Sequence, residues 1–208
     1  GATTVMVVGF VNAGLMTLVQ ATPIIMGANI GTTITAQIVQ LESLGITAWF
    51  AVLTAIGAFM QMLSKKDTIQ KIGSLLAGLG MIFVGLNVMK ESMSIFQEIP
   101  AIQNILVNTT NPAILILVAL ALTALVQSSS ATTGIMITLA ASVNIPIKTI
   151  MFATLGVNIG SCITSIIASF GTNTNAKRAS LIHLLFNSIG AIVFFPIIYW
   201  APLDKWFE

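Results

Sequence analysis

The sequence predicts an all-α fold: a polytopic membrane protein with inverted repeats, a re-entrant hairpin and broken transmembrane helices. Of its 208 residues, 56% are hydrophobic and 7% are charged. Soluble domains devote about a quarter of their residues to charge, so this chain could not cover a water-facing surface and belongs in a lipid bilayer. The other two observations are an internal repeat and polar motifs inside apolar segments.

Three apolar segments are long enough to cross a hydrocarbon core about 30 Å thick, which needs roughly 20 helical residues. They are residues 44–63, 72–89 and 179–200. A fourth segment, residues 114–126, is too short to span comfortably and is followed at once by the polar sequence QSSS. We therefore expect residues 114–143 to form a hairpin that enters and leaves the membrane on one side.

Two further apolar segments are interrupted by similar polar sequences, GANIGTTIT within residues 22–41 and GVNIGSCIT within residues 150–169. A shift of 129 residues aligns them without a gap and also places Ala2-Thr3-Thr4 on Ala131-Thr132-Thr133. Such self-similarity at a fixed offset indicates an internal repeat. Gly1 then takes the place of Ser130, so we expect the first copy of QSSS to stand immediately before this chain.

The repeat divides one transmembrane domain into three parts. Within the single domain of residues 1–208, residues 1–64 are a first repeat without its amino-terminal hairpin limb. Residues 65–113 are a connecting span with an interfacial segment, and residues 114–200 are the second repeat. Within the connecting part, residues 91–111 have helical apolar spacing with Pro100 in the middle. This pattern indicates either an amphipathic segment on the membrane surface or an ordinary folded loop.

The charged loops predict how the two copies are oriented. If both interrupted helices cross the membrane, one side receives a group of basic residues with a single acid, Asp67. We call it the basic side; its cations are Lys65, Lys66, Lys71, Lys177 and Arg178. The positive-inside rule makes this side cytoplasmic. We therefore expect a multi-pass protein of the cell inner (plasma) membrane. The two copies then cross in opposite directions, as in transporters that work by alternating access.

Hydroxyl and amide groups at the hairpin tip and at both interruptions predict an anion site beside a cation site. Turns at membrane depth survive only inside protein or beside a water-filled cavity. Helix N-termini and serine hydroxyls donate to anions, whereas carbonyl and amide oxygens suit a hard cation. No Asp, Glu, Lys or Arg lies in the middle of a predicted span, which favours a metal cation such as sodium over a proton relay.

Each polar residue also has a structural interpretation. Serine and threonine in membrane helices often bond a carbonyl one turn back or join two helices. His183 is either an intramembrane functional residue or a satisfied histidine near the cytoplasmic interface, where we expect it. The duplication of the interrupted motif favours a binding site over structural roles alone.

The sequences QSSSATT and GVNIGSCIT, together with the earlier ATT and GANIGTTIT, resemble the type II sodium–phosphate cotransporter family. The resemblance covers nearly the whole chain and implies a bacterial, amino-terminally truncated member that carries inorganic phosphate with sodium. It implies a phosphate site formed by Gln127, Ser128, Ser129, Ser130, Thr132, Thr133, Thr3 and Thr4. It also implies unwound helices whose sodium ligands are Asn29, Thr32, Thr33, Gln127, Asn158 and Ser161.

Other functions stay open. An uncoupled anion channel often has charged rings along its pore, and none is evident in the sequence. An intramembrane serine hydrolase would use Ser129 as nucleophile with His183 as base within about 3 Å. A purely structural membrane subunit would leave the duplicated motifs unexplained.

We therefore expect a transporter and not an enzyme, without catalytic residues or a cofactor, and with sodium as its sole metal and coupling ion. The expected partners are inorganic phosphate, sodium and the lipid bilayer, and a homo-oligomer stays open. The net charge of +2 is too small and too scattered for a nucleic-acid partner.

Overall fold

The computed structural model describes residues 1–34, 37, 47–97, 109, 111–142 and 145–202. Every regular element in these ranges is an α-helix, which confirms the predicted all-α class. In chain order the helices are α1 (Ala2–Asn12), α2 (Leu18–Gly31), α4 (Thr47–Leu63), α5 (Asp67–Gln97), α7 (Pro112–Val126), α8 (Ser129–Ser142), α9 (Ile147–Gly160), α10 (Ile163–Ala168) and α11 (Thr174–Trp200).

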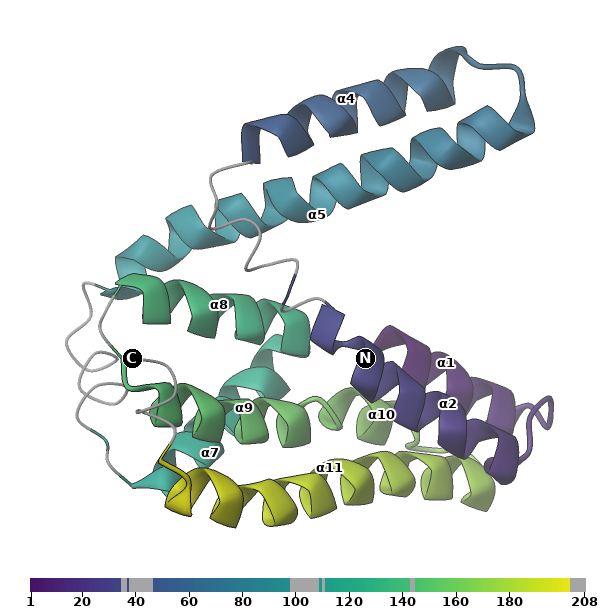
Figure 1. Cartoon of the computed structure of the whole chain (residues 1–208). Helices are drawn as coiled ribbons and strands as arrows, with labels where there is room; N and C mark the ends of the chain where they lie inside the picture. The colour runs from purple at the N-terminus through teal and green to yellow at the C-terminus, as the bar shows by residue number, and fades with distance from the viewer. Residues whose placement is uncertain (35–36, 38–46, 98–108, 110, 143–144, 203–208) are drawn as a thin grey trace.

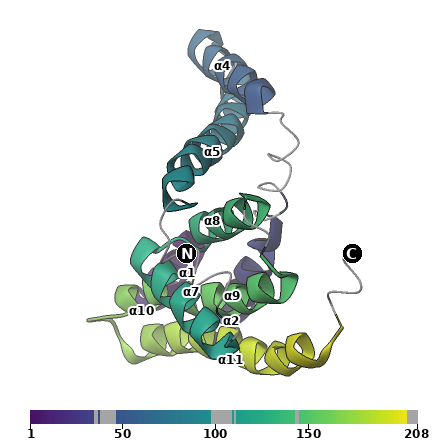
Figure 2. The same cartoon turned by 90° about the vertical axis from the view of Figure 1, so that its left-hand side faces the viewer.

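Helices α4 and α5 form an antiparallel hairpin at one edge of the molecule, and the other helices pack into a body beside it (Figures 1 and 2). Phe50 and Phe83 stack between the two helices of this hairpin. Within the body, one buried apolar cluster joins α1, α2 and α11, and two more join α7 to α8, α9 and α11. Helix α11 therefore packs against elements of both repeats.

Three helical segments are long and apolar enough to cross a membrane, namely Asp67–Gly85, Ile147–Ala168 and Thr174–Trp200. They identify the chain as a membrane protein. The first and last overlap the predicted spans 72–89 and 179–200. The part of the predicted span 44–63 that precedes residue 47 lies outside the described residues. The short segment after residue 111 forms α7, with 15 residues, as predicted.

The segment at residues 91–111, predicted to be interfacial or an ordinary loop, begins as part of a longer helix. Residues 91–97 continue α5, which runs for 31 residues from Asp67 to Gln97. No glycine or proline stands between Met89 and Gln97 to stop the helix. The rest of that prediction, apart from Thr109 and Asn111, falls outside the described residues.

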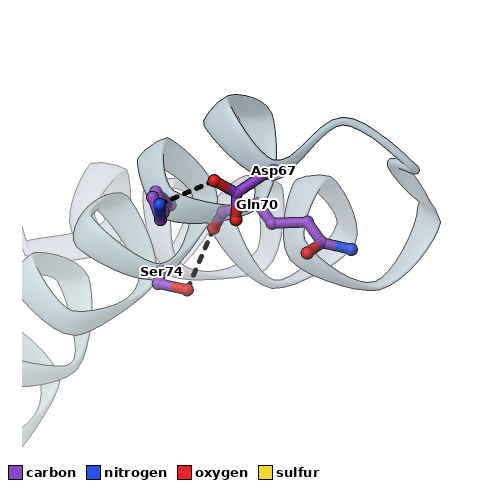
Figure 3. Close-up of polar contacts among 4 residues, drawn as sticks. Asp67, Gln70 and Ser74 are labelled. Atoms are coloured by element: carbon purple, nitrogen blue, oxygen red, sulfur yellow. Dashed lines mark hydrogen bonds and ion pairs between the residues drawn. The ribbon is translucent and has the colours of Figure 1, made fainter.

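The turn before α5 is held by exposed polar side chains. Gln70 Nε2 donates to the Ser64 carbonyl at 2.8 Å. In the first turns of α5, Ser74 Oγ donates to the Gln70 carbonyl at 2.9 Å (Figure 3). The Asp67–Lys71 ion pair has side chains 77% and 75% exposed, so its contribution to stability is small. This turn and the start of α11 both lie at the right of Figure 1, so the segments with the basic-side cations share one end of the molecule.

The two interrupted motifs form helices of equal length. Helices α2 and α9 have 14 residues each, and their ends are 129 positions apart, as in the sequence repeat. Their C-caps have the same conformation, with φ −62° and ψ −22° at Thr32, and φ −61° and ψ −21° at Ser161. In Figure 1, α2 runs from right to left and α9 from left to right.

The glycines of the repeat pack in one copy and not in the other. A Cβ atom at Gly160 would lie 2.6 Å from the Leu120 carbonyl oxygen, and one at Gly156 would collide with the Ile116 carbonyl. Both carbonyls belong to α7. The equivalent Gly27 and Gly31 on α2 have nothing within 4 Å of such an atom in the described part of the chain. At these two motif positions, close helix contact therefore depends on glycine in α9 and not in α2, within the described residues.

This asymmetry predicts different effects for one substitution at two equivalent positions. In the 208-residue chain, Gly160→Ala should destabilise the fold by about 1–3 kcal/mol, because it overpacks the α7–α9 contact. Gly27→Ala should be neutral or stabilise by up to about 1 kcal/mol, because alanine is the better helix former. Thermal unfolding in detergent measures both. Equal melting temperatures for the two variants would contradict the packing difference.

Candidate functional site

The tip of the QSSS hairpin is a tight reversal between two helices. Helix α7 ends at Val126, and Gln127 takes a left-handed conformation, with φ 57° and ψ 20°. It is the one non-glycine residue with positive φ in the described ranges. Its N–H donates to the Thr123 carbonyl at 2.8 Å, and the chain then turns back into α8. The predicted hairpin is therefore present.

Ser128 caps the start of α8. Its Oγ accepts from the Ala131 N–H at 3.2 Å, and its carbonyl accepts from the Thr132 N–H and hydroxyl, each at 3.0 Å. Among the described residues, the N–H and hydroxyl groups of Ser129 and Ser130 have no partner. The start of α8 therefore presents donors that are available to a ligand.

These donors line a cavity of about 200 Å³, called here the larger cavity. Gly1 and Ala2, at the start of α1, also line it, as does Ser161 at the end of α9. The N-terminus of α8 therefore opens on this space, and its partial positive charge favours an anion there.

A smaller cavity of about 20 Å³ shares Gly1, Ser129 and Ser161 with the larger one. Such a volume has room for one water-sized guest. Its other lining residues come from α1, from both repeat helices, from the C-cap of α2 and from α11: Thr4, Ala28, Asn29, Thr32, Asn158 and His183. The hairpin tip and both interrupted motifs therefore meet at one place.

The backbone at the two interruptions is tightened, not unwound, so the expectation of unwound segments is wrong. Thr32, Ser161 and Cys162 all keep right-handed helical angles. Thr32 Oγ1 donates to the Ala28 carbonyl at 3.0 Å, and Ser161 Oγ donates to the Asn158 carbonyl at 2.7 Å. These bonds hold the chain close to the preceding turn.

Most of the predicted site residues line the two cavities. They are Gln127, Ser128, Ser129, Ser130, Thr4, Asn29, Thr32, Asn158 and Ser161. The structure does not bring Thr3, Thr33, Thr132 and Thr133 to them. Successive residues of a helix point in different directions, so neighbouring threonines cannot all face one cavity. Thr132 is buried against Ser128, and Thr33 Oγ1 bonds the Ile30 carbonyl at 2.7 Å.

His183, which was expected near the cytoplasmic interface, is buried inside the protein. The side chain is 2% exposed and lines the smaller cavity. Helix α11 begins at Thr174, five residues before the predicted span, so His183 lies about 14 Å along the helix axis. Its Nδ1 is 2.9 Å from Ser165 Oγ, and its Nε2 is 3.3 Å from Asn29 Oδ1.

Asn187 was missed by the sequence analysis. Its Nδ2 donates to Asn29 Oδ1 at 3.2 Å. The available signal was the spacing of Ser180, His183 and Asn187, which puts three polar side chains on one face of an apolar helix. All three are buried.

The same contacts bear on the serine hydrolase hypothesis. Both ring nitrogens of His183 face other partners, and neither bonds Ser129. The described residues therefore give the Ser129 hydroxyl no hydrogen-bonded general base, which such a mechanism needs.

Comparison with known proteins assigns the family. The chain matches the Na+/Pi-cotransporter family over residues 1–91 and 98–199. It belongs to this family. No solved structure matches the chain.

Bacterial relatives of this family member cover nearly all of the chain. "Uncharacterized protein YqeW" of Bacillus subtilis is 29% identical over 196 residues, which are 93% of this chain and 62% of that protein. "Putative inorganic phosphate export protein YjbB" is 28% identical in Salmonella typhimurium and 26% identical in Escherichia coli K12. Each YjbB match covers 95% of this chain and 36% of the relative. The chain thus spans less than two thirds of these relatives.

Proposed function

We propose that this Na+/Pi-cotransporter family member carries inorganic phosphate across the membrane, coupled to sodium, by alternating access. The observation that carries the proposal is the convergence of the QSSS tip and both repeat helices on two adjoining cavities. The family assignment and the name of the YjbB relatives support phosphate as the substrate.

The larger cavity is the proposed phosphate site. Its unpartnered donors are the N–H and hydroxyl groups of Ser129 and Ser130, with the Gln127 amide and the start of α1 beside them. All are neutral, so they can bind phosphate without fixing a permanent charge in the membrane. Three of the predicted phosphate ligands, Thr3, Thr132 and Thr133, do not line the cavities, and the proposal gives them no contact with phosphate.

The smaller cavity is the proposed sodium site. The Asn158 amide has no partner among the described residues, and Thr32 and Ser161 add oxygens to the same wall. Hard cations prefer such oxygen ligands. Asn29 lines this cavity too, but its Oδ1 already accepts two hydrogen bonds.

Charge balance supports coupling to a cation. Neither cavity is lined by Asp, Glu, Lys or Arg. Burying a phosphate anion in a neutral, poorly solvated site is costly, and a cation bound beside it offsets that cost. His183 lines the smaller cavity and is a side chain that could carry a proton. The proposal of sodium as the coupling ion therefore rests mainly on the family assignment.

The repeat geometry supports alternating access by an inverted repeat. The matching helices α2 and α9 have equal lengths and run in opposite directions in Figure 1. A site between two such units can open to either side of the membrane in turn. The basic segments at one end of the molecule support a multi-pass orientation in the cell inner membrane with that end in the cytoplasm.

Transport in proteoliposomes tests the proposal. Uptake of labelled phosphate by the complete protein should require a sodium gradient, because the cation shares the neutral site with the anion. Equal uptake with potassium in place of sodium would rule out sodium coupling. Phosphate flux that follows its own gradient, with no effect of any cation or pH gradient, would favour the uncoupled channel.

A pair of substitutions tests the phosphate site. Ser129→Ala should raise the KM for phosphate about tenfold, because a desolvated hydrogen-bond donor is lost. Thr3→Ala, on the exposed side of α1, should leave the KM unchanged. If Ser129→Ala has the wild-type KM, that hydroxyl is not a phosphate ligand.

A further inference from the structure

We propose that His183 is a positioning residue of this site: together with Asn187 it holds the Asn29 side chain at the wall of the smaller cavity. The inference rests on the proposed function for its effect on transport. Its structural part rests on the hydrogen bonds of Asn29, His183 and Asn187 alone.

The Asn29 amide has a defined orientation. Its Nδ2 donates to the Ile25 carbonyl at 2.9 Å, one turn back on α2, so Oδ1 faces α11. There Oδ1 lies 3.3 Å from His183 Nε2 and 3.2 Å from Asn187 Nδ2. Because an amide oxygen only accepts, the contact with Asn29 is a hydrogen bond when His183 carries its proton on Nε2, and the proposal assigns this tautomer.

The other face of the imidazole is fixed by hydroxyls. With the proton on Nε2, Nδ1 is an acceptor, and it lies 2.9 Å from Ser165 Oγ. The Ser165 hydroxyl also donates to the Cys162 carbonyl at 2.8 Å, so its single proton is shared between these two acceptors. Ser180 Oγ in turn donates to Ser165 Oγ at 3.3 Å. Hydrogen-bond contacts therefore connect Ser180, Ser165, His183 and Asn29 in one buried network.

Asn187 closes the network on a second path. Its Nδ2 lies 3.3 Å from Cys162 Sγ and 3.1 Å from the His183 carbonyl, and that carbonyl also accepts from the Cys162 thiol at 3.5 Å. Helix α11 therefore bonds the first repeat through Asn29 and the second through Cys162 and Ser165. In the described part of the chain no buried side-chain nitrogen or oxygen is left without a partner.

The second copy lacks such a clamp within the described residues. Asn158 is the repeat equivalent of Asn29, and its side chain is exposed and without a partner there. The repeat equivalent of His183 is Thr54, whose hydroxyl bonds the Phe50 carbonyl on its own helix at 2.8 Å. The two asparagines therefore have different roles: Asn29 forms a pre-organised wall, and Asn158 is free to turn toward a ligand. Fixing one wall in advance lowers the entropy that binding must remove.

Three substitutions of His183 separate the two ring nitrogens. The amide of His183→Gln reaches the place of Nε2 and can still donate to Asn29, whereas that of His183→Asn reaches only the place of Nδ1, and His183→Leu offers no polar group. We expect the KM values for phosphate and sodium to stay within about twofold of wild type for Gln. They should rise about tenfold for Asn and Leu, the factor for one lost hydrogen bond. The maximal rate per folded protein should change little.

Two controls complete the transport series. Ser180→Ala, at the outer end of the network, should change KM by less than twofold. Asn187→Leu should raise KM as His183→Leu does, and the double variant should be less than additive because both residues hold one oxygen. Wild-type KM in His183→Asn, with a raised KM in His183→Gln, would overturn the positioning role and assign His183 to Ser165 alone.

A spectroscopic readout decides the structural part without transport. The chain has a single histidine, so nitrogen-15 labelling of histidine gives one unambiguous pair of ring signals. We expect the Nε2–H tautomer, with the Nε2 signal shifted in the Asn29→Ala variant. Absence of phosphate transport by the wild-type protein would refute the proposed function. The spectrum would still test whether His183 donates a hydrogen bond to Asn29. An Nδ1–H tautomer, or a spectrum unchanged by Asn29→Ala, would overturn the inference.

Discussion

Every polar group that this chain places at membrane depth must find a partner inside the protein, because lipid offers none. The structure meets this requirement locally. Thr54, Thr123 and Thr154 each donate to the carbonyl four residues back on their own helices. Where the hairpin tip meets the repeat helices, the hydroxyls of Ser129 and Ser130 and the Asn158 amide have no partner among the described residues. The candidate site is thus the place where internal pairing stops and a ligand can take over.

Much of the architecture could be predicted because its signals are periodic. The 129-residue offset predicted the equivalence of α2 and α9, and both helices end at the second glycine of the motif, Gly31 and Gly160. The short α7 followed by QSSS indicated a reversal, because 15 apolar residues cannot cross the bilayer. The meeting of Ser129 with Asn29 followed from the same repeat.

The parts that could not be predicted depend on side-chain direction and helix register. Hydropathy placed the start of the last span at Ala179, whereas hydrogen bonding to the Asn173 cap starts α11 at Thr174, so that His183 lies in the third turn of the helix. Composition cannot show that Thr32 and Ser161 bond the preceding turn and keep the backbone helical. Nor can a motif show which of its threonine side chains points away from a cavity. For this reason the sequence did not predict that Thr3 and Thr133 do not line the cavities.

The left-handed turn at Gln127 has a thermodynamic consequence for the hairpin. A residue with a Cβ atom is disfavoured at φ 57° by about 1 kcal/mol, whereas glycine occupies that region freely. The loop would therefore be more stable with glycine, but it would then display no amide at its apex. The backbone at Gln127 therefore has a higher conformational free energy than a glycine would have there, and this strained residue lies beside the ligand cavity.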